Sequence, residues 1–436
     1  MIKFYKVGGC VRDEILQRPV HDIDWEVIGA DVEDMLNLGF KQVGKDFPVF
    51  LHPTTGEEYS IGRIDISTGQ KHTDFTFVTN KNIDLKTALL RRDFTINALC
   101  KDENGNIVDC FGGLQHIKQK ILRHINTDNF KTDPLRVLRA ARFVSQLEFS
   151  IHPSTIKLCK QMVKAGALDN LTPERIWKEI EKALHTFNFH LFLQTLDELD
   201  VLKIIFPELY ALKEVPENTT YHPEGNAYKH VLLTFQQIHE QPESHYSEYQ
   251  FSKDLQHQTA LINFGLLCHD LGKALTDKEK WPAHHGHDNL GIELVDKMCD
   301  RLKIPNEYRD FGKLACKYHM MFYEFLKCQK KTQYDKIKAI TNFKHNKDLL
   351  LLYRVHRCDL MGRQGKISKQ RIDNMYETFL HINQIYQSLK NKTLKDLPEQ
   401  TQKELLKYSG AQFGKLYRDA MISYLKHEMS KYKNIS

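Results

Sequence analysis

The apolar periodicity of this chain changes once, near residue 133, and that change limits the folds that it can adopt. Before it, short strand-like segments such as Phe4–Val7, Ile23–Ile28 and Phe75–Val78 alternate with helical stretches. After it, apolar residues recur at helical spacing into the C-terminal tail. We therefore predict an α+β chain, in which an N-terminal α/β domain precedes mostly helical segments.

The length of 436 residues predicts about three domains and a tail. A connection at 212–226, rich in Pro, Gly and Asn, separates two helical regions. The predicted division is 1–130 (mixed α/β), 131–215 (helical), 226–365 (helical and rich in His) and 366–436 (a basic helical tail).

Composition excludes several classes of protein. The chain has no run of about 18 apolar residues, and its N-terminus lacks an apolar signal core, so neither a transmembrane helix nor secretion is expected. Its nine Cys include no Cys-x-x-Cys pair. This argues against a zinc ribbon or a disulfide scaffold and predicts a cytoplasmic protein.

The net charge of +6 permits a nucleic-acid partner without requiring one. Residues 390–436 hold ten Lys or Arg and five Asp or Glu, so the tail carries +5 of that charge. The tail is therefore either a surface that steers a nucleic-acid backbone or an ordinary solvated face rich in Lys.

A Gly pair and two acids suggest phosphate chemistry near the N-terminus. Gly8 and Gly9 follow a predicted strand, so their backbone can approach an anion, and Arg12 can add a two-pronged phosphate contact. Asp22 and Asp24 alternate on the next predicted strand and share a face, where a divalent cation would relieve their repulsion. Taken alone, each pattern is more commonly a tight turn or a solvated edge.

Two further segments carry arginine beside acids. Arg92 can neutralise a triphosphate, while Asp93 and Asn97 can orient arginine side chains or hold a ribose. Asp133 can cap a helix that bears Arg136, Arg139 and Arg142 at every third position. Each segment alone is more commonly a solvated polar surface.

The region 226–365 is unusually rich in His. An adjacent His-Asp pair on a predicted helix, with other His and Asp around it, combines neutral imidazoles with carboxylates, which suits a transition metal. A lone His is more commonly a satisfied polar residue, but the density of this cluster predicts a metal site. Its members are His230, His269, Asp270, His284, His285, His287, His319 and Asp359.

Together these segments carry a resemblance to a known family. The order and spacing of Gly8-Gly9-x-x-Arg12-Asp13, Asp22-x-Asp24, Arg91-Arg92-Asp93-x-x-x-Asn97 and Asp133-x-x-Arg136 resemble the motifs of class II CCA-adding tRNA nucleotidyltransferases, within the polymerase-beta superfamily. The order His230, His269-Asp270, Asp359 resembles the HD phosphohydrolases. The chain as a whole resembles the bacterial multifunctional subgroup, which has an all-α HD domain appended.

This resemblance implies roles for individual residues. Asp22, Asp24 and Asp65 would be the catalytic carboxylates, with Asp22 and Asp24 holding Mg²⁺ for attack of a tRNA 3′-hydroxyl on an α-phosphate. Asp133 and Arg136 would select cytosine and adenine by hydrogen bonds to the base edge. The residues implied to contact CTP and ATP are Gly9, Arg12, Arg92, Asp133, Arg136, Arg139 and Arg142, supported by Gly8, Arg91, Asp93 and Asn97.

The sequence departs from the family pattern at two positions. The family usually has Glu where Asp65 stands, and Glu also usually precedes the selecting Asp, where this chain has Thr132. In the family, that second Glu orients the selecting Arg. The resemblance therefore predicts that Arg136 is held less rigidly in this chain. Residues 66–78 match the flexible loop tied to the final A addition, and their length favours a complete CCA enzyme.

The HD resemblance implies that His230, His269, Asp270 and Asp359 bind one divalent metal, Ni²⁺ or Mn²⁺. His284, His285, His287 and His319 would support these ligands or contact phosphate. The implied activities are 2′,3′-cyclic phosphodiesterase, 2′-nucleotidase and phosphatase. These could restore the 3′-hydroxyl that nucleotide addition needs.

The expected partners are tRNA, CTP and ATP, with no membrane, in a monomer or a weak homodimer. Three alternatives stay open. A bacterial poly(A) polymerase shares the N-terminal motifs but normally lacks the His cluster. An HD phosphohydrolase could use its N-terminal half only to dock tRNA, and a plain RNA-binding protein would have no chemistry at all.

Overall fold

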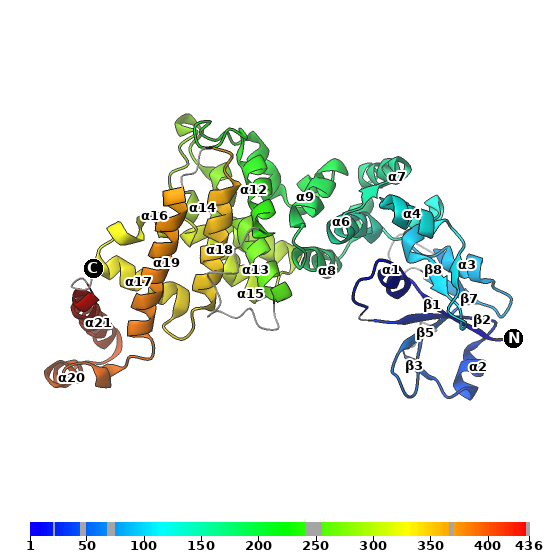
Figure 1. The fold of residues 1–436 in the computed structure, drawn as a ribbon, viewed down its shortest axis with the longest axis horizontal. Coiled ribbons are helices and arrows are strands. Elements are labelled where there is room, and N and C mark those ends of the chain that lie inside the picture. The colour runs from blue at the N-terminus through cyan, green and yellow to red at the C-terminus, as the bar shows by residue number, and fades with distance from the viewer. Residues whose placement is uncertain (21, 44–48, 68–74, 240–254, 366–368, 433–436) are drawn as a thin grey trace. The chain divides into compact units, whose positions relative to one another are not determined.

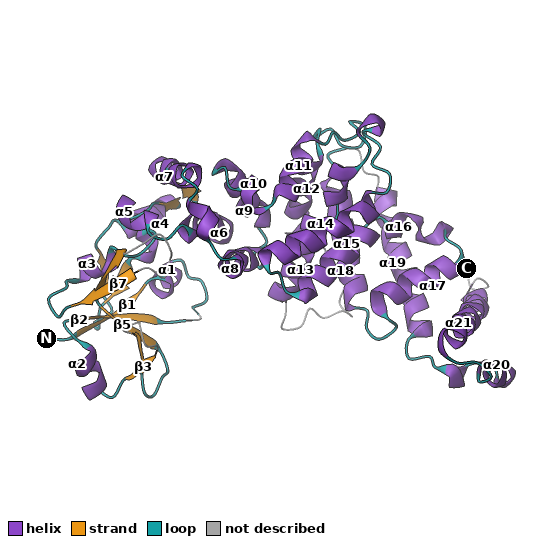
Figure 2. Ribbon diagram, turned by 180° about the vertical axis from the view of Figure 1, so that it is seen from behind, coloured by secondary structure: helices purple, strands orange, loops and turns teal. Residues whose placement is uncertain are grey.

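The computed structural model describes residues 1–436 except 21, 44–48, 68–74, 240–254, 366–368 and 433–436. The backbone divides into two compact units. The first comprises Met1–Ala183 and Leu191–Leu202, and the second comprises Leu184–His190 and Lys203–Ser436. Within the described residues every strand belongs to the first unit (Figures 1 and 2), which confirms the predicted α+β class.

The first unit is built on a seven-stranded sheet in the order β3-β4-β5-β2-β1-β8-β9, in which only β2 and β5 run parallel. Its strands are β1 (Lys3–Val7), β2 (Asp24–Ile28), β3 (Lys41–Val43), β4 (Val49–Leu51), β5 (Glu58–Ile61), β8 (Leu99–Lys101) and β9 (Ile107–Asp109). An antiparallel pair, β6 (Arg63–Ser67) and β7 (Phe75–Thr79), and a parallel pair, β10 (Ile121–Leu122) and β11 (Ser150–Ile151), form two small sheets.

The register of β2 sorts its side chains between the two faces of the large sheet. Val27 pairs with Phe4 on one side and with Ile61 on the other, and these apolar residues belong to one core cluster. Because alternate residues of a strand point to opposite faces, Asp24 and Glu26 share the other face. The apolar face thus packs β2 into the core, and Asp24 and Glu26 lie together on the opposite face of the sheet.

The helices of the first unit cover the remaining sequence between and after the strands. They are α1 (Gly9–Ile15), α2 (Val32–Asn37), α3 (Leu85–Leu89), α4 (Gly113–Gln119), α5 (Thr127–Lys131), α6 (Leu135–Leu147), α7 (Pro153–Lys164), α8 (Pro173–Leu184) and α9 (Phe189–Glu198), with short 3₁₀ turns η1 (Thr95–Asn97) and η2 (Ala167–Asn170). In α6, Val137, Leu138, Ala140 and Ala141 are fully buried, which fixes the face on which its arginines lie.

The second unit is helical throughout its described residues. After α10 (Leu202–Ile205) its helices are α11 (Pro207–Ala211), α12 (Ala227–Gln236), α13 (Leu255–Cys268), α14 (His287–Leu302), α15 (Asn306–Tyr318), α16 (Met321–Glu324), α17 (Lys330–Thr341), α18 (Lys347–Gly362), α19 (Lys369–Leu389), α20 (Glu399–Leu405) and α21 (Gly410–Tyr432). Short 3₁₀ turns are η3 (Leu212–Glu214), η4 (Gln237–His239), η6 (Leu271–Leu275), η7 (Lys278–Lys280), η8 (Phe325–Lys327) and η9 (Leu394–Asp396).

Helix α13 is the centre of the second unit. It is apolar on all sides, and every residue from Thr259 to Cys268 is buried, as expected for a helix enclosed by others. It packs against α15 and α18, while α12 packs against α18. His269 and Asp270 directly follow α13, so this pair is positioned by a helix that is buried among its neighbours.

The tail is helical, as predicted, and it is packed. Leu405, Met421 and Leu425 are buried, and Arg418 forms an ion pair with Asp335 of α17. Removal of residues 390–436 would therefore expose apolar surface as well as remove charge. None of the described helices has the length and apolar character needed to cross a membrane.

One local prediction is wrong. We expected the second strand to begin at Ile23 and to carry both acids, but β2 begins at Asp24 and Asp22 precedes it. The ladder to β5 starts at the pair Asp24–Glu58, and Asp22 lies beyond the last paired residue. The four-segment domain division remains a prediction. Of the predicted flexible loop 66–78, residues 68–74 lie outside the described part of the chain.

Candidate functional site

A tight turn between β1 and α1 opens the first site. Gly8 has a φ of +89°, a backbone conformation that favours glycine. A Cβ atom at this position would lie 2.4 Å from Nη1 of Arg92. The turn therefore needs glycine both for its backbone and for the space that Arg92 occupies.

The two candidate metal carboxylates, Asp22 and Asp24, are exposed. Neither carboxylate makes a hydrogen bond or an ion pair with any residue that the structure describes. The third predicted acid, Asp65, lies on β6 opposite Phe77, and its side chain is outside the described part. The charge of Asp24 does act on Arg92, but no cation is in ion-pair contact with either carboxylate among the described residues. Two exposed carboxylates of this kind are suited to a divalent cation.

Glu26 is a site residue that the sequence analysis missed. Its side chain is fully buried, and its Oε2 accepts a hydrogen bond from Arg91 Nη2 at 2.6 Å and lies 3.9 Å from Arg92 Nη2. Burial, with the nearby charge of Arg91, lowers the pKa of Arg92. The position of Glu26, two residues after Asp24 on the same strand face, is the signal that could have found it.

Arg12 is buried and is held by two partners. Its Nε and Nη2 donate to the two carboxylate oxygens of Asp13 at 2.9 and 2.8 Å, and its Nη1 donates to Asn97 Oδ1 at 2.6 Å. The two-pronged contact that we predicted for a phosphate is thus made with Asp13.

Asp93 joins η1 to α6. Its Oδ1 accepts from Asn97 Nδ2 at 2.9 Å, and its Oδ2 accepts from Arg139 Nε at 2.7 Å. Burial alone would raise the pKa of this carboxyl, but the charges of Arg139 and Arg136 and the hydrogen bond from Asn97 lower it well below its usual value. Asp93 is therefore a buried anion that fixes Arg139.

Arg142 ends this network in a buried ion pair. Its Nε donates to Glu179 Oε2 at 2.5 Å, and its Nη1 donates to Gln146 Oε1 at 2.7 Å. The guanidinium lies 4.0 Å from the ring centroid of Phe143. The sequence analysis missed Glu179 of α8, because its partner lies 37 residues away in the chain.

Arg136 is oriented by two backbone carbonyls. Its Nη1 donates to the oxygen of Asn129 and its Nη2 donates to the oxygen of Arg91, each at 2.5 Å. The Asn129 side chain donates in turn to the carbonyl of Leu90, the residue before Arg91, at 2.7 Å, and this bond joins the two segments that carry the orienting carbonyls. Thr132, where the family has Glu, donates its hydroxyl to the same Asn129 oxygen at 2.7 Å.

Asp133 is oriented by Arg175 of α8. Nη2 of Arg175 lies 3.1 and 2.9 Å from the two oxygens of Asp133, and the backbone N–H of Leu135 donates to Asp133 Oδ1 at 3.1 Å. Asp133 is thus held by Arg175, and Arg136 is held by Asn129 and Arg91. Of these three partners, the sequence analysis named only Arg91.

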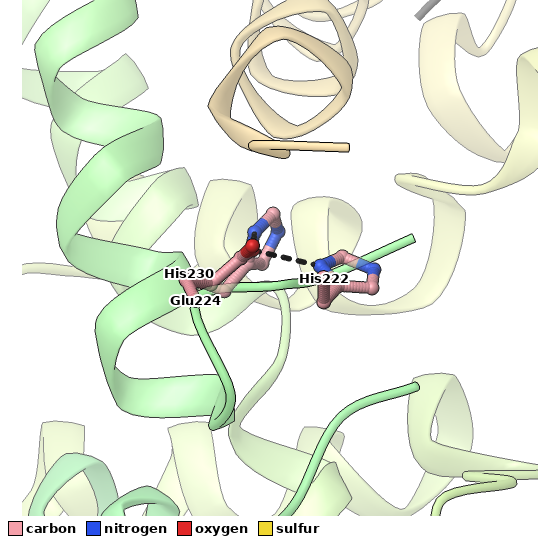
Figure 3. Close-up of side chains that lie close together, drawn as sticks. All are labelled: His222, Glu224 and His230. Carbon is pink, nitrogen blue, oxygen red and sulfur yellow. Dashed lines mark hydrogen bonds and ion pairs between the residues drawn. The ribbon is translucent and has the colours of Figure 1, made fainter. Parts of the chain in front are cut away.

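The His cluster of the second unit is brought together around His230. This buried ring places Nε2 2.9 Å from Asp359 Oδ1 and Nδ1 3.0 Å from Glu224 Oε1. Glu224 Oε1 also lies 2.9 Å from His222 Nδ1 (Figure 3). Burial lowers the pKa of His230, but its contacts with Asp359 and Glu224 raise the pKa overall.

The His269-Asp270 pair lies beside this group. His269 Nε2 is 3.2 Å from Asp270 Oδ2, and Lys273 Nζ is 2.8 Å from the same oxygen. The other oxygen of Asp270, Oδ1, lies 3.5 Å from His287 Nε2 and 3.7 Å from His319 Nε2. Within the described residues, ligand atoms of His230, His269 and Asp359 lie within 4.8 Å of one another, and so do those of Asp270, His287 and His319.

The two other predicted His residues lie outside these sets. His284 Nδ1 lies 3.0 Å from the Thr276 hydroxyl, and its Nε2 lies 2.9 Å from the Pro216 carbonyl. His285 is exposed. His284 thus joins the segments that flank the cluster and presents neither nitrogen to the metal-ligand group.

A basic stripe follows one side of α7. Lys157, Lys160 and Lys164 line a surface hollow, with Asp200 beside them. Lys160 forms an ion pair with Asp200 at 3.4 Å. Such a stripe suits a phosphate backbone but is also common on solvated helices.

Comparisons with known proteins place these sites in context. Residues 4–123 match the family model described as the Poly A polymerase head domain. Residues 148–212 match the model described as a probable RNA and SrmB-binding site of polymerase A.

Several solved structures have a similar fold. The Bacillus stearothermophilus CCA-adding enzyme in complex with CTP is 21% identical, with a TM-score of 0.63 over 100% of this chain and 95% of that chain. A CCA-adding enzyme with ATP is 20% identical, with a TM-score of 0.60 over 97% and 86%. The Thermotoga maritima CCA-adding enzyme complexed with tRNA is 19% identical, with a TM-score of 0.58 over 97% and 87%. At these identities the likeness shows a shared fold.

Proposed function

We propose that the first unit adds and repairs the 3′-terminal CCA of tRNA, using CTP and ATP and no nucleic-acid template. The observation that carries this proposal is a pair of exposed carboxylates, Asp24 at the start of β2 and Asp22 just before it, which form no ion pair within the described residues. Asp24 shares its face of the sheet with Glu26, which binds Arg91. The fold shared with CCA-adding enzymes supports it.

The donor set fits Mg²⁺, because hard oxygen ligands without a cationic partner suit this ion. Asp22 and Asp24 would hold it, with Asp65 as the proposed third carboxylate that activates the 3′-hydroxyl. When bound, Mg²⁺ would offset the negative charge that develops as the α-phosphate is attacked.

The arginines divide into two groups. Arg92, which lies against the Gly8 turn, is the proposed triphosphate contact, with the Gly9 backbone beside it. Arg12, Arg139 and Arg142 each form a close ion pair, at 2.8, 2.6 and 2.5 Å, and would reach a nucleotide only by exchanging that partner, whereas Arg92 lies 3.9 Å from its acid, Glu26. We therefore assign these three mainly to positioning.

Base selection would fall to Asp133 and Arg136. Cytosine and adenine each offer an amino donor beside a ring-nitrogen acceptor, which matches a carboxylate and a guanidinium. Uracil and guanine place a carbonyl where the amino group should be, and that oxygen would face the carboxylate of Asp133 without a hydrogen bond. Such selection requires that both side chains keep a fixed orientation toward the base, and the contacts of Asp133 and Arg136 provide it.

The test is incorporation of labelled CTP into tRNA that lacks CCA. The Asp22→Asn variant should lose at least about a hundredfold in kcat/KM, since a ligand of the proposed metal is removed. Asp128→Asn is the matched control, because Asp128 is an exposed carboxylate on α5. Unchanged addition by Asp22→Asn would favour the alternative in which the N-terminal half only docks tRNA.

We also propose that the second unit is an HD-type phosphohydrolase that acts on 2′,3′-cyclic phosphates, 2′-nucleotides and other phosphomonoesters. His230, His269, Asp270 and Asp359 fit a transition metal such as Ni²⁺ or Mn²⁺, because they combine buried imidazoles with carboxylates. Such an ion would supply a hydroxide and polarise a phosphoryl oxygen. Glu224 fixes His230 by accepting from its Nδ1.

The double variant His269→Ala/Asp270→Ala tests this second assignment. It should lose cyclic phosphodiesterase activity and keep CCA addition. Retained hydrolysis would contradict the assignment, as would loss of CCA addition in a variant that remains folded.

A poly(A) polymerase is the second candidate, because the family model that matches residues 4–123 is described by that name. It differs from our proposal in product length and in nucleotide choice. The His cluster of the second unit, which bacterial poly(A) polymerases normally lack, disfavours it.

A further inference from the structure

An arginine lies beside Asp359, one of the proposed metal ligands of the second unit. Arg363 follows the end of α18, and its Nη2 lies 3.4 and 3.3 Å from Oδ1 and Oδ2 of Asp359. The side chain is 12% exposed, and its Nε is buried with no hydrogen-bond partner among the described residues. A buried N–H without an acceptor is costly, and a bound anion would supply the acceptor.

Two glycines fix the backbone on either side of Arg363. A Cβ atom on Gly362 would lie 2.9 Å from the Cα of Thr234 in α12, and one on Gly365 would lie 2.8 Å from the carbonyl oxygen of Tyr221. Contacts this short exclude a larger side chain unless the backbone moves. The end of α18 therefore packs closely against α12 and against the segment that precedes it, and Arg363 lies between these two contacts.

Arg363 differs from Lys273, the other cation that contacts the cluster within the described residues. Lys273 Nζ lies 2.6 Å from Glu217 Oε1 and 2.8 Å from Asp270 Oδ2, so two acids hold it. Among the described acids Arg363 contacts Asp359 alone, at the longer distances given above. A metal ion on Asp359 would take up much of the carboxylate charge that otherwise attracts Arg363. Arg363 is therefore the cation that an incoming anion can recruit.

A tyrosine ring joins Arg363 to a second arginine. The guanidinium carbon of Arg363 lies 5.8 Å from the ring centroid of Tyr323 in α16, and that of Arg371 in α19 lies 4.5 Å from the same centroid. Burial raises the pKa of Tyr323, although the charges of both arginines act in the opposite direction, so the ring is neutral at pH 7. Two cations that share a neutral ring repel each other, and bound anions relieve that repulsion.

We propose that Arg363 and Arg371 bind two successive phosphates of an RNA 3′ end at the metal centre of the second unit. Arg363, which contacts Asp359, binds the terminal phosphate that is hydrolysed, and Arg371 binds the 5′-phosphate of the same nucleotide. The planar fork of a guanidinium matches the oxygens of a phosphate. The inference rests on the phosphohydrolase proposed above and narrows its substrate to nucleotides that carry a 5′-phosphate, as they do within a polynucleotide.

The test compares two small substrates that differ only in one phosphate: cytidine 2′,3′-cyclic phosphate and the same compound with a 5′-phosphate. The full-length chain, loaded with Ni²⁺, should have a kcat/KM about tenfold higher for the second, because one charge-assisted contact is added. In Arg371→Gln this ratio should fall to about one. In Arg363→Gln the KM for both substrates should rise at least about tenfold.

Arg309→Gln is the matched control, because Arg309 of α15 pairs with the exposed Asp300 of α14. It should leave both KM values and their ratio unchanged. Elemental analysis should give equal Ni²⁺ contents for all variants, since none of the changed residues is a proposed ligand. If Arg363→Gln does not fold, Arg363→Lys, which keeps the charge and loses the fork, should still raise both KM values about threefold.

A second readout does not depend on turnover. In a Mn²⁺-loaded chain that carries Asp24→Asn, so that the nucleotidyl-transfer site holds no ion, the bound Mn²⁺ should broaden the phosphorus resonance of inorganic phosphate. Adding Arg363→Gln should raise the Kd for phosphate about tenfold with the Mn²⁺ content unchanged.

The outcomes separate this inference from the proposed phosphohydrolase. Equal kcat/KM for the two substrates in the wild type would overturn the two-phosphate site, and so would an unchanged Kd for phosphate in Arg363→Gln; hydrolysis would stand in either case. A wild type that broadens the phosphate resonance but hydrolyses neither substrate would overturn the phosphohydrolase and leave phosphate binding by Arg363 standing. No bound metal at all would overturn both.

Discussion

The backbone carbonyl oxygen of Asn129 lies 2.5 Å from Nη1 of Arg136, and that of Arg91 lies 2.5 Å from Nη2. Two carbonyls on the guanidinium fork make the same pattern of contacts that a carboxylate would make. At position 132, where the resemblance leads us to expect Glu, this chain has Thr, whose hydroxyl donates to the same Asn129 oxygen. Arg136 is therefore held in a fixed orientation without that acid.

This relationship predicts that discrimination depends on Asn129. Asn129→Ala removes the hydrogen bond to the Leu90 carbonyl, which is worth about 1 kcal/mol, and frees the carbonyl that orients Arg136. The ratio of kcat/KM for CTP over UTP should fall about fivefold. Asn104→Ala, in an exposed turn, should leave the ratio unchanged. An equally unchanged ratio in Asn129→Ala would show that the carbonyls do not control selection.

Gly8 should be needed for nucleotide binding and not only for its backbone conformation. Gly8→Ala and Gly105→Ala both place Ala at a φ above +80°, at a cost of roughly 1 kcal/mol each. Only the Gly8 change also meets Arg92, since nothing lies within 4 Å of a Cβ at Gly105. Steady-state kinetics should show KM for CTP rising about tenfold in Gly8→Ala alone. A similar rise in Gly105→Ala would point to general destabilisation.

The buried anion Asp93 makes the first unit sensitive to acid. Its folded pKa lies below the unfolded value of about 3.9, so its contribution to stability is complete above that pH and is lost as pH falls through the folded pKa. Asp93→Asn should lower stability by roughly 2 kcal/mol at pH 7. The difference in Tm between the wild type and this variant should hold above about pH 5 and narrow below about pH 4. A difference in Tm that grows as the pH falls would contradict a stabilising role for the ionised Asp93.

Metal should stabilise the second unit. Ions that bind only the folded state raise its stability by about 2.7 kcal/mol at 100 times Kd. Thermal scans with Ni²⁺ should show a higher Tm for the transition of that unit, and chelator should reverse the change. In His230→Ala the increase should shrink or vanish, whereas in His257→Ala, whose ring contacts the exposed Glu307, it should persist. An equal increase in His230→Ala would place the ion elsewhere.

Much of the fold follows from the local sequence. The strand at Phe4–Val7 and the glycine turn after it are defined by neighbouring residues, and so is the helix that carries Arg136. The start of β2 could not be predicted as well, because it depends on pairing with β5 through Asp24 and Glu58, 34 residues apart.

The sites show the same limit. Sequence spacing predicted roles for Asp133 and Arg136, and those roles remain a prediction. Their partners Arg175 and Asn129 were missed, because those contacts depend on how α8 and α5 pack beside Asp133 and α6. The His cluster was found from its density, but no spacing rule could show that Asp270 has one oxygen facing each of two ligand groups. That fact comes from the approach of α14 to Asp270.

The most direct test of the account is the product formed on tRNA that lacks CCA. With CTP alone the protein should add two nucleotides, with ATP alone almost none, and with both it should add C, C and A and then stop. UTP and GTP should be poor substrates, because their bases mismatch Asp133 and Arg136. Long poly(A) products from ATP alone would contradict the account and establish the polymerase alternative.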